Sequence, residues 1–351
     1  MDLNHQIAAL FVIGFSGSQL IASAPIVRDI RESGLGGVVL FSRCLHDPDQ
    51  PGNIVSPDSL RRLTASLRSL RPDPPLICID QEGGAVKRLA PANGFPDFPS
   101  ARQMAAVGIE ETGHQAERTA ALLADVGITV NFAPVVDIDR VADNPIIGAL
   151  GRSFGNRAEP VSDHAAAWIR GHRKHGIISC IKHFPGHGSS ISDSHLGFVD
   201  ITGTWHEEEL QPYRSLLDLG LVDMVMTGHL FNRRLDPRYP ATLSSATVTG
   251  LLRCQLGFDG VVISDDLQMQ AITEHYRLDE ALCLALAAGV DLLLIGNNLM
   301  YYPDLLPHCI AAVRSGIERG ALTTDQIACA YRRVQNLKKR QRINANETHH
   351  S

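Results

Sequence analysis

The chain has 351 residues, of which 44% are hydrophobic and 20% charged, and a formal net charge of −6 at pH 7. A chain of this length can bury a full hydrophobic core, as one large α/β domain or as two small ones. The negative charge and the lack of a basic run interleaved with aromatic residues argue against a nucleic-acid-binding protein.

Seven scattered cysteines without a C-x-x-C pair indicate buried free thiols in a reducing compartment and give no zinc signature. The apolar stretch 7–15 imitates a signal-peptide core, but no Lys or Arg precedes Arg28, so the basic region of such a peptide is missing. No apolar run approaches the ~18 residues of a membrane span. We therefore expect a cytoplasmic protein that does not contact a membrane.

Short apolar runs recur along the chain, most of them separated by longer helical segments. Strands are predicted at 10–15, 37–41, 76–80, 129–136, 177–181, 223–226, 260–264 and 290–295. Helices are predicted at 24–33, 57–70, 101–125, 206–219, 246–255, 278–288, 302–315 and 324–338. Strands that are apolar on both faces indicate a parallel sheet covered by helices, and eight such units predict a (β/α)₈ barrel of TIM type.

A doubly wound open sheet is the competing fold. It is disfavoured because no G-x-G-x-x-G motif follows the first strand. Since no low-complexity linker divides the chain, residues 1–338 are expected to form a single catalytic domain, and residues 339–351 a polar, frayed tail.

Ionisable and amide side chains follow six of the eight predicted strands. In a barrel these strand ends form the active face. They carry Asp80, Glu82 and Arg88 after the third strand, Asp137 and Arg152 after the fourth, Lys182 and His183 after the fifth, His229 after the sixth, Asp265 and Asp266 after the seventh, and Asn297 and Asn298 after the eighth. A single carboxylate at such a junction is often only a helix N-cap, but the whole set favours a site. Carboxylates such as Asp80 and bidentate donors such as Arg88 and Arg152 are suited to sugar hydroxyls.

The polar loop 182–195, KHFPGHGSSISDSH, follows the buried fifth strand directly and allows three interpretations. Its histidines and Asp193 could bind a metal, although Pro185 and Gly186 prevent His183 and His187 from sharing a helix face. The histidines could instead only shape the loop. In the third interpretation Asp193 orients His195 and raises its basicity, so that His195 works as a general acid/base.

Asp265 is the second candidate catalytic residue. It emerges from the apolar run GVVIS at the mouth of the predicted barrel, where a carboxylate could attack an anomeric carbon as nucleophile. Its neighbour Asp266 would point elsewhere and is interpreted as a structural or N-capping residue.

These motifs resemble glycoside hydrolase family 3, in its bacterial β-N-acetylglucosaminidase branch. The resemblance runs in register from about residue 8 to about residue 335 and rests on KHFPGHG (182–188) with DSH (193–195), ISDDLQM (263–269), DQEGG with Arg88, and GRSFG (151–155). It implies a (β/α)₈ barrel and a retaining mechanism that uses no metal or other cofactor. By position, Asp265 would be the nucleophile, His195 the acid/base and Asp193 its orienting partner. Asp80, Arg88, Arg152, Lys182 and His183 would hold N-acetylglucosamine.

Three features depart from the pattern of the family. Ser189 and Ser190 stand where many members have Asp-Thr, and Ala85 stands where an Arg is frequent. The chain also leaves no room for the second α/β domain of many members. Single-domain members are typically cytoplasmic and cut N-acetylglucosamine from peptidoglycan fragments ending in anhydro-N-acetylmuramic acid, so the resemblance implies that substrate and we expect a monomer.

Other functions remain open on the same residues. The fold could serve a β-glucosidase or a phosphorylase that uses phosphate in place of water. A metal-dependent hydrolase built on the His/Asp cluster and a sugar-binding barrel without activity are the alternatives from other classes.

Overall fold

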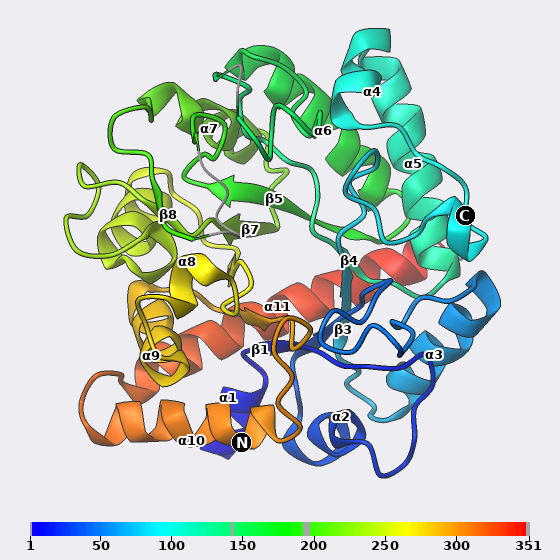
Figure 1. The fold of residues 1–351 in the computed structure, drawn as a ribbon, viewed down its shortest axis with the longest axis vertical. Coiled ribbons are helices and arrows are strands. Elements are labelled where there is room, and N and C mark those ends of the chain that lie inside the picture. Colours follow the sequence, from blue (N-terminus) through cyan, green and yellow to red (C-terminus); the bar gives the residue numbers. More distant parts are fainter. Residues whose placement is uncertain (1, 142–143, 192–196, 349–351) are drawn as a thin grey trace.

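The computed structural model describes residues 2–141, 144–191 and 197–348, with the side chains of the last helix described as far as Arg342. Eight parallel strands curl into a nearly closed barrel, which confirms the predicted fold class (Figure 1). They are β1 (Phe11–Gly14), β2 (Gly37–Val39), β3 (Leu76–Ile79), β4 (Val130–Asn131), β5 (Ile178–Phe184), β7 (Met224–Thr227), β9 (Val261–Ser264) and β10 (Leu293–Ile295). Their order in the sheet is β10-β1-β2-β3-β4-β5-β7-β9.

The two ends of this order, β9 and β10, meet just before β10. Ile263 and Leu292 form a parallel bridge there, and the N–H of Ser264 donates to the carbonyl of Leu292 at 3.0 Å. Every residue of β1, β3, β7 and β9 is buried. One face of each strand fills the barrel interior and the other lies under the helices, which explains why these strands are continuously apolar in sequence.

Helical segments surround the barrel. They are α1 (Leu3–Ala8), α2 (Pro25–Arg28), η1 (Asp29–Ser33), α3 (Pro57–Ser69), η2 (Pro91–Asn93), α4 (Ala101–Val107), α5 (Ile109–Asp125), α6 (Ala158–Arg173), η3 (Glu207–Leu210), α7 (Gln211–Asp218), η4 (Ala241–Leu243), η5 (Ala246–Gln255), α8 (Gln270–Thr273), α9 (Leu278–Ala288), α10 (Leu305–Glu318) and α11 (Thr324–Thr348). Two short strands, β6 (Val199–Asp200) and β8 (Leu230–Phe231), form a separate parallel pair. Among the helices described, none combines the length and apolarity that crossing a membrane requires.

Two helix predictions need correction. The expected helix 101–125 is divided into α4 and α5 at Gly108, whose φ of 141° is accessible mainly to glycine. The sequence analysis also does not predict α6, which lies between β4 and β5. No side chain caps this helix at Arg157, so its start lacks the N-cap signal in the sequence.

The C-terminal helix α11 runs on to Thr348, so its expected end at Lys338 is wrong. Lys338 Nζ lies 2.9 Å from Asp73 Oδ2, and Arg340 Nη1 lies 3.3 Å from Asp223 Oδ1. Both aspartates precede barrel strands, so α11 spans the end of the barrel where the strands begin. In Figure 1 this helix runs diagonally across the middle of the view. Ion pairs to distant parts of the chain stabilise a segment whose own composition is merely polar.

Candidate active site

A cavity of about 360 Å³ opens at the carboxyl ends of the barrel strands. All the described residues that the sequence analysis assigns to sugar binding or catalysis line this one cavity, and they come from the ends of β3, β5 and β9 and from the loop after β4. They are Asp80, Arg88, Arg152, Lys182, His183 and Asp265. Asp193 and His195 lie outside the described residues.

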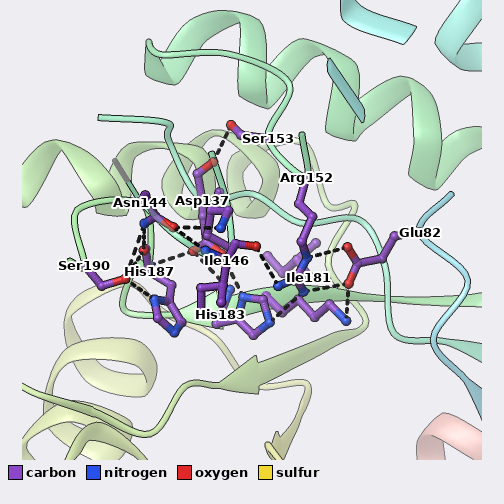
Figure 2. Close-up of polar contacts among 12 residues, drawn as sticks. Glu82, Asp137, Asn144, Ile146, Arg152, Ser153, Ile181, His183, His187 and Ser190 are labelled. Carbon is purple, nitrogen blue, oxygen red and sulfur yellow. Dashed lines mark hydrogen bonds and ion pairs between the residues drawn. The ribbon is translucent and has the colours of Figure 1, made fainter. Parts of the chain in front are cut away.

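Paired charges form the floor of the cavity. Lys182 Nζ lies 2.9 Å from Asp80 Oδ1 and 2.7 Å from Glu82 Oε1. The guanidinium of Arg152 donates to both carboxylate oxygens of Glu82, each at 2.8 Å (Figure 2). Arg88 completes the cluster at 3.2 Å from Asp80 Oδ2. Each cation thus has a carboxylate partner, which offsets the cost of burying its charge.

This network fixes the ionisation states of the two carboxyl groups. Burial alone would raise the pKa of Glu82, but Arg152 and Lys182 together hold it well below its usual value. The pKa of Asp80 is lowered in the same way: its burial is outweighed by Lys182 and Arg88. Both groups are therefore carboxylates at neutral pH and can accept hydrogen bonds from sugar hydroxyls.

Asp137 organises the turn that follows β5. Its Oδ2 lies 2.7 Å from His183 Nδ1, and its Oδ1 accepts hydrogen bonds from the backbone N–H groups of His183 at 3.2 Å and His187 at 2.8 Å (Figure 2). A carboxylate acceptor places the imidazole proton on Nδ1. The His183 Nε2 then accepts from Arg152 Nη2 at 3.4 Å, so the ring is held in one orientation beside the charged floor.

The two serines that depart from the family pattern have different surroundings. Ser190 Oγ lies 2.5 Å from His187 Nδ1 and donates to the His187 carbonyl, and Asn144 Nδ2 reaches both Ser190 Oγ at 3.3 Å and the same carbonyl at 2.8 Å (Figure 2). Ser189 is buried beside Glu209.

Burial lowers the pKa of His187 to about 4, with nearby His183 adding to the effect, so this imidazole is neutral in the folded protein.

Asp265 and Asp266 have different surroundings at the end of β9. The backbone N–H of Asp265 donates to the carbonyl of Thr227 at 3.1 Å, continuing the sheet, and its side chain lines the cavity. Asp266 Oδ1 accepts from the N–H groups of Gln268 and Gly296, each at 3.0 Å. Asp266 therefore links the chain after β9 to the end of β10, in line with the structural part expected of it. It also lines the cavity, so the expectation that it points elsewhere is wrong.

The sequence analysis missed the functional importance of Glu82 and Asp137. Glu82 stands in the same DQEGG motif as Asp80, and Asp137 follows the fourth predicted strand, so both carry the strand-end signal. Their partners, Arg152 and His183, are distant in sequence and could not be assigned from it. Ala85 is exposed and does not line the cavity, so its departure from the family pattern does not alter the charged floor.

A metal site is a separate question. Among the described residues, no group of three or more His, Cys, Asp or Glu side chains is placed to hold a metal ion. Asp193 and His195 are not among those residues.

Comparisons with known proteins identify the family. The model of the glycosyl hydrolase family 3 N-terminal domain matches residues 3–337. A β-hexosaminidase of Alkalilimnicola ehrlichii is 36% identical over 284 residues, which cover 78% of this chain and 77% of the relative. The solved β-N-acetylhexosaminidase of Beutenbergia cavernae superposes with a TM-score of 0.85 at 30% identity, over 97% of this chain and 99% of its own.

A second solved structure adds a larger relative. The family 3 β-N-acetylglucosaminidase of Paenibacillus sp. FPU-7 superposes with a TM-score of 0.88 at 34% identity, over 98% of this chain. This chain spans only 64% of that protein. The match of the family model over nearly the whole chain shows that the chain belongs to glycosyl hydrolase family 3 and is a glycoside hydrolase.

Proposed function

We propose that the protein is a retaining, exo-acting β-N-acetylglucosaminidase that removes terminal β-linked N-acetylglucosamine through a covalent glycosyl-Asp265 intermediate. The observation that carries the proposal is the position of Asp265, in the same cavity as Asp80, Arg152 and Lys182. A carboxylate beside a charged, hydrogen-bonding floor can meet an anomeric carbon whose sugar hydroxyls that floor holds. The names of the relatives, β-hexosaminidase and β-N-acetylglucosaminidase, support the choice of sugar.

The residues of the cavity have distinct roles in this proposal. Asp80 accepts hydrogen bonds from sugar hydroxyls, and Arg88, Arg152 and Lys182 donate them, while His183 presents its imidazole beside Arg152. Because these groups already bind one another, they are ordered before the sugar arrives and lose little entropy on binding.

The reaction then takes two steps. Asp265 attacks the anomeric carbon while His195, oriented by Asp193, protonates the departing glycosidic oxygen. In the second step His195 removes a proton from water, which attacks the anomeric carbon and releases Asp265. Two inversions give overall retention of configuration. The acid/base is an imidazole, so the usual distance rule for two catalytic carboxyl groups does not apply directly.

The natural substrates in this proposal are peptidoglycan fragments in which N-acetylglucosamine is linked to anhydro-N-acetylmuramic acid. The protein would act on them in the cytoplasm as a monomer, with residues 1–338 as its single catalytic domain. The resemblance of the 182–195 motif to that of the bacterial β-N-acetylglucosaminidase branch supports the choice of substrate.

A comparison of substrates tests the proposal against its competitors on the same fold. A chromogenic N-acetyl-β-glucosaminide should be cleaved much faster than the matching β-glucoside. Product analysis with and without phosphate should give free N-acetylglucosamine in both cases. A faster glucoside reaction would favour a β-glucosidase, and a sugar 1-phosphate product would favour a phosphorylase. Loss of activity on exhaustive chelation, with recovery on adding metal, would favour a metal-dependent hydrolase.

A further inference from the structure

The cavity has two zones of different character. Its floor consists of buried charges, with Arg152 8% and Lys182 2% exposed. Its rim is apolar and exposed: Leu45, Leu150 and Leu299 line the cavity and are 54%, 41% and 46% exposed. A terminal sugar held by the floor would leave the group on the far side of the glycosidic bond, the aglycone, against this rim.

The rim carries one cation that differs from those of the floor. Arg88, Arg152 and Lys182 each have an ion pair with Asp80 or Glu82. Arg43 also lines the cavity, and its side chain is exposed. Across the described part of the chain, no carboxylate lies within ion-pair distance of its guanidinium and no side-chain hydrogen bond holds it. The five N–H donors of this group therefore remain available to a ligand.

The backbone that presents Arg43 is held firmly. Asn298 Nδ2 donates to the carbonyl of Arg43 at 3.1 Å, and its Oδ1 accepts from the N–H of Leu45 at 2.8 Å. On the other side, Asn53 Oδ1 accepts from the N–H of Phe41 at 2.9 Å. Two asparagine side chains thus fix the segment after β2, while no described residue pairs with the guanidinium. This arrangement fixes the backbone that carries the cation without neutralising the guanidinium.

We propose that Arg43 binds an anionic group of the aglycone and makes the enzyme selective for glycosides whose leaving group carries a carboxylate. The inference rests on the proposed function, because the rim faces an aglycone only if the floor holds the terminal sugar. A planar guanidinium matches a carboxylate through two parallel hydrogen bonds. Leu45, Leu150 and Leu299 line the same cavity, and apolar side chains beside such a contact reduce its exposure to water and strengthen it. Arg43 is thus a specificity-determining residue and takes no part in bond cleavage.

Two carboxylate sources fit this chemistry, and matched substrates separate them. The first substrate is N-acetylglucosaminyl-anhydro-N-acetylmuramic acid, with a free lactyl carboxylate. The second is its methyl ester, which has the same leaving group without the charge. The third carries an alanyl-glutamate dipeptide on the lactyl group, so that its carboxylates belong to the peptide. kcat/KM is measured for each with the unaltered enzyme, Arg43→Gln, Arg43→Lys and, as a matched control, Arg68→Gln. Arg68 is exposed on α3 and does not line the cavity.

The proposal predicts that Arg43→Gln lowers kcat/KM roughly three- to tenfold for a carboxylate substrate, with the ester unchanged. Arg43→Lys should keep part of the preference, and Arg68→Gln all of it. A loss confined to the first substrate identifies the sugar carboxylate, and a loss confined to the third identifies the peptide. Equal effects on all three substrates, or none, would overturn the proposal. If the unaltered enzyme cleaved none of the three but did cleave a glucoside, the proposed function would fail instead.

Discussion

The guanidinium of Arg152 and the carboxylate of Glu82 form a bidentate pair, with both N–O distances 2.8 Å, although the two side chains are only 8% and 7% exposed. Lys182 shares the same carboxylate at 2.7 Å. Glu82 therefore compensates two buried cations at once, and the charged floor of the cavity depends on it.

Replacement of Glu82 by Gln should destabilise the protein by about 3–5 kcal/mol, because it leaves the buried Arg152 without its carboxylate partner and Lys182 with Asp80 alone. The free energy of unfolding in urea measures the loss. Glu117→Gln is the control, since its pair with Lys174 is exposed and should contribute at most about 1 kcal/mol. Similar losses in the two variants would contradict the importance given to the Glu82 pair.

Acidification should weaken the fold through two buried histidines. Burial lowers the pKa of His172 to about 3 and, with His183, that of His187 to about 4. The unfolded chain takes up these protons near pH 6.5, but the folded chain does not. The free energy of unfolding is therefore highest above pH 6.5 and falls as the pH drops toward the pKa values of the folded protein. Between pH 6.5 and pH 5 the loss should be about 1.5 kcal/mol per histidine.

The variant His172→Gln isolates this effect, because His172 lies away from the cavity and stacks on Trp168. Its unfolding free energy should depend less steeply on pH between 5 and 6.5 than that of the unaltered protein. Parallel curves would show that the protonation of His172 is not coupled to folding.

Asp265 and Asp266 are neighbours with separable roles, so alanine variants of the two form a matched pair. Asp265→Ala should lower kcat by at least roughly 10³-fold with little change in melting temperature. Asp266→Ala removes the acceptor of two backbone N–H groups and should cost about 1–3 kcal/mol of stability. Appreciable hydrolysis of an aryl N-acetylglucosaminide by Asp265→Ala would exclude Asp265 as the nucleophile.

The acid/base role proposed for His195 predicts a dependence on the leaving group. His195→Ala should lose roughly 10²–10⁴-fold in kcat/KM on substrates with poor leaving groups, which need protonation, and much less on those with good ones. Asp193→Ala should show the same trend in weaker form. A series of aryl glycosides with graded phenol pKa values measures it, and an equal loss across the series would count against His195.

Much of the fold could be predicted from the sequence because the signals are local. Most barrel strands are continuous apolar runs, and the strand-end rule predicts that Asp80, Lys182 and Asp265 share one face, as they do in the cavity. The division of the helix at Gly108 was missed because a single glycine within a helical pattern is commonly tolerated. The extension of α11 depends on contacts such as Lys338 with Asp73, which only the folded chain brings together.

The residues of the site are easier to predict from the sequence than the ion pairs and hydrogen bonds between them. Glu82 and Arg152 are 70 residues apart, and Lys182 and Asp80 are 102 residues apart. A strand-end position identifies each side chain as a candidate, but which charge meets which is decided by loop lengths and barrel geometry. For the same reason Asp137 could be placed after the fourth strand, but not as the partner of His183.

The covalent bond proposed between Asp265 and the sugar can be trapped and located in the chain. A 5-fluoro N-acetylglucosaminyl fluoride, which slows release of the sugar, would be incubated with the enzyme, and the digested protein analysed by mass spectrometry. We expect one added fluoro-N-acetylglucosaminyl group on the peptide that contains Asp265. Attachment to Asp80 or Glu82, or steady release of inverted sugar with no labelled peptide, would contradict it.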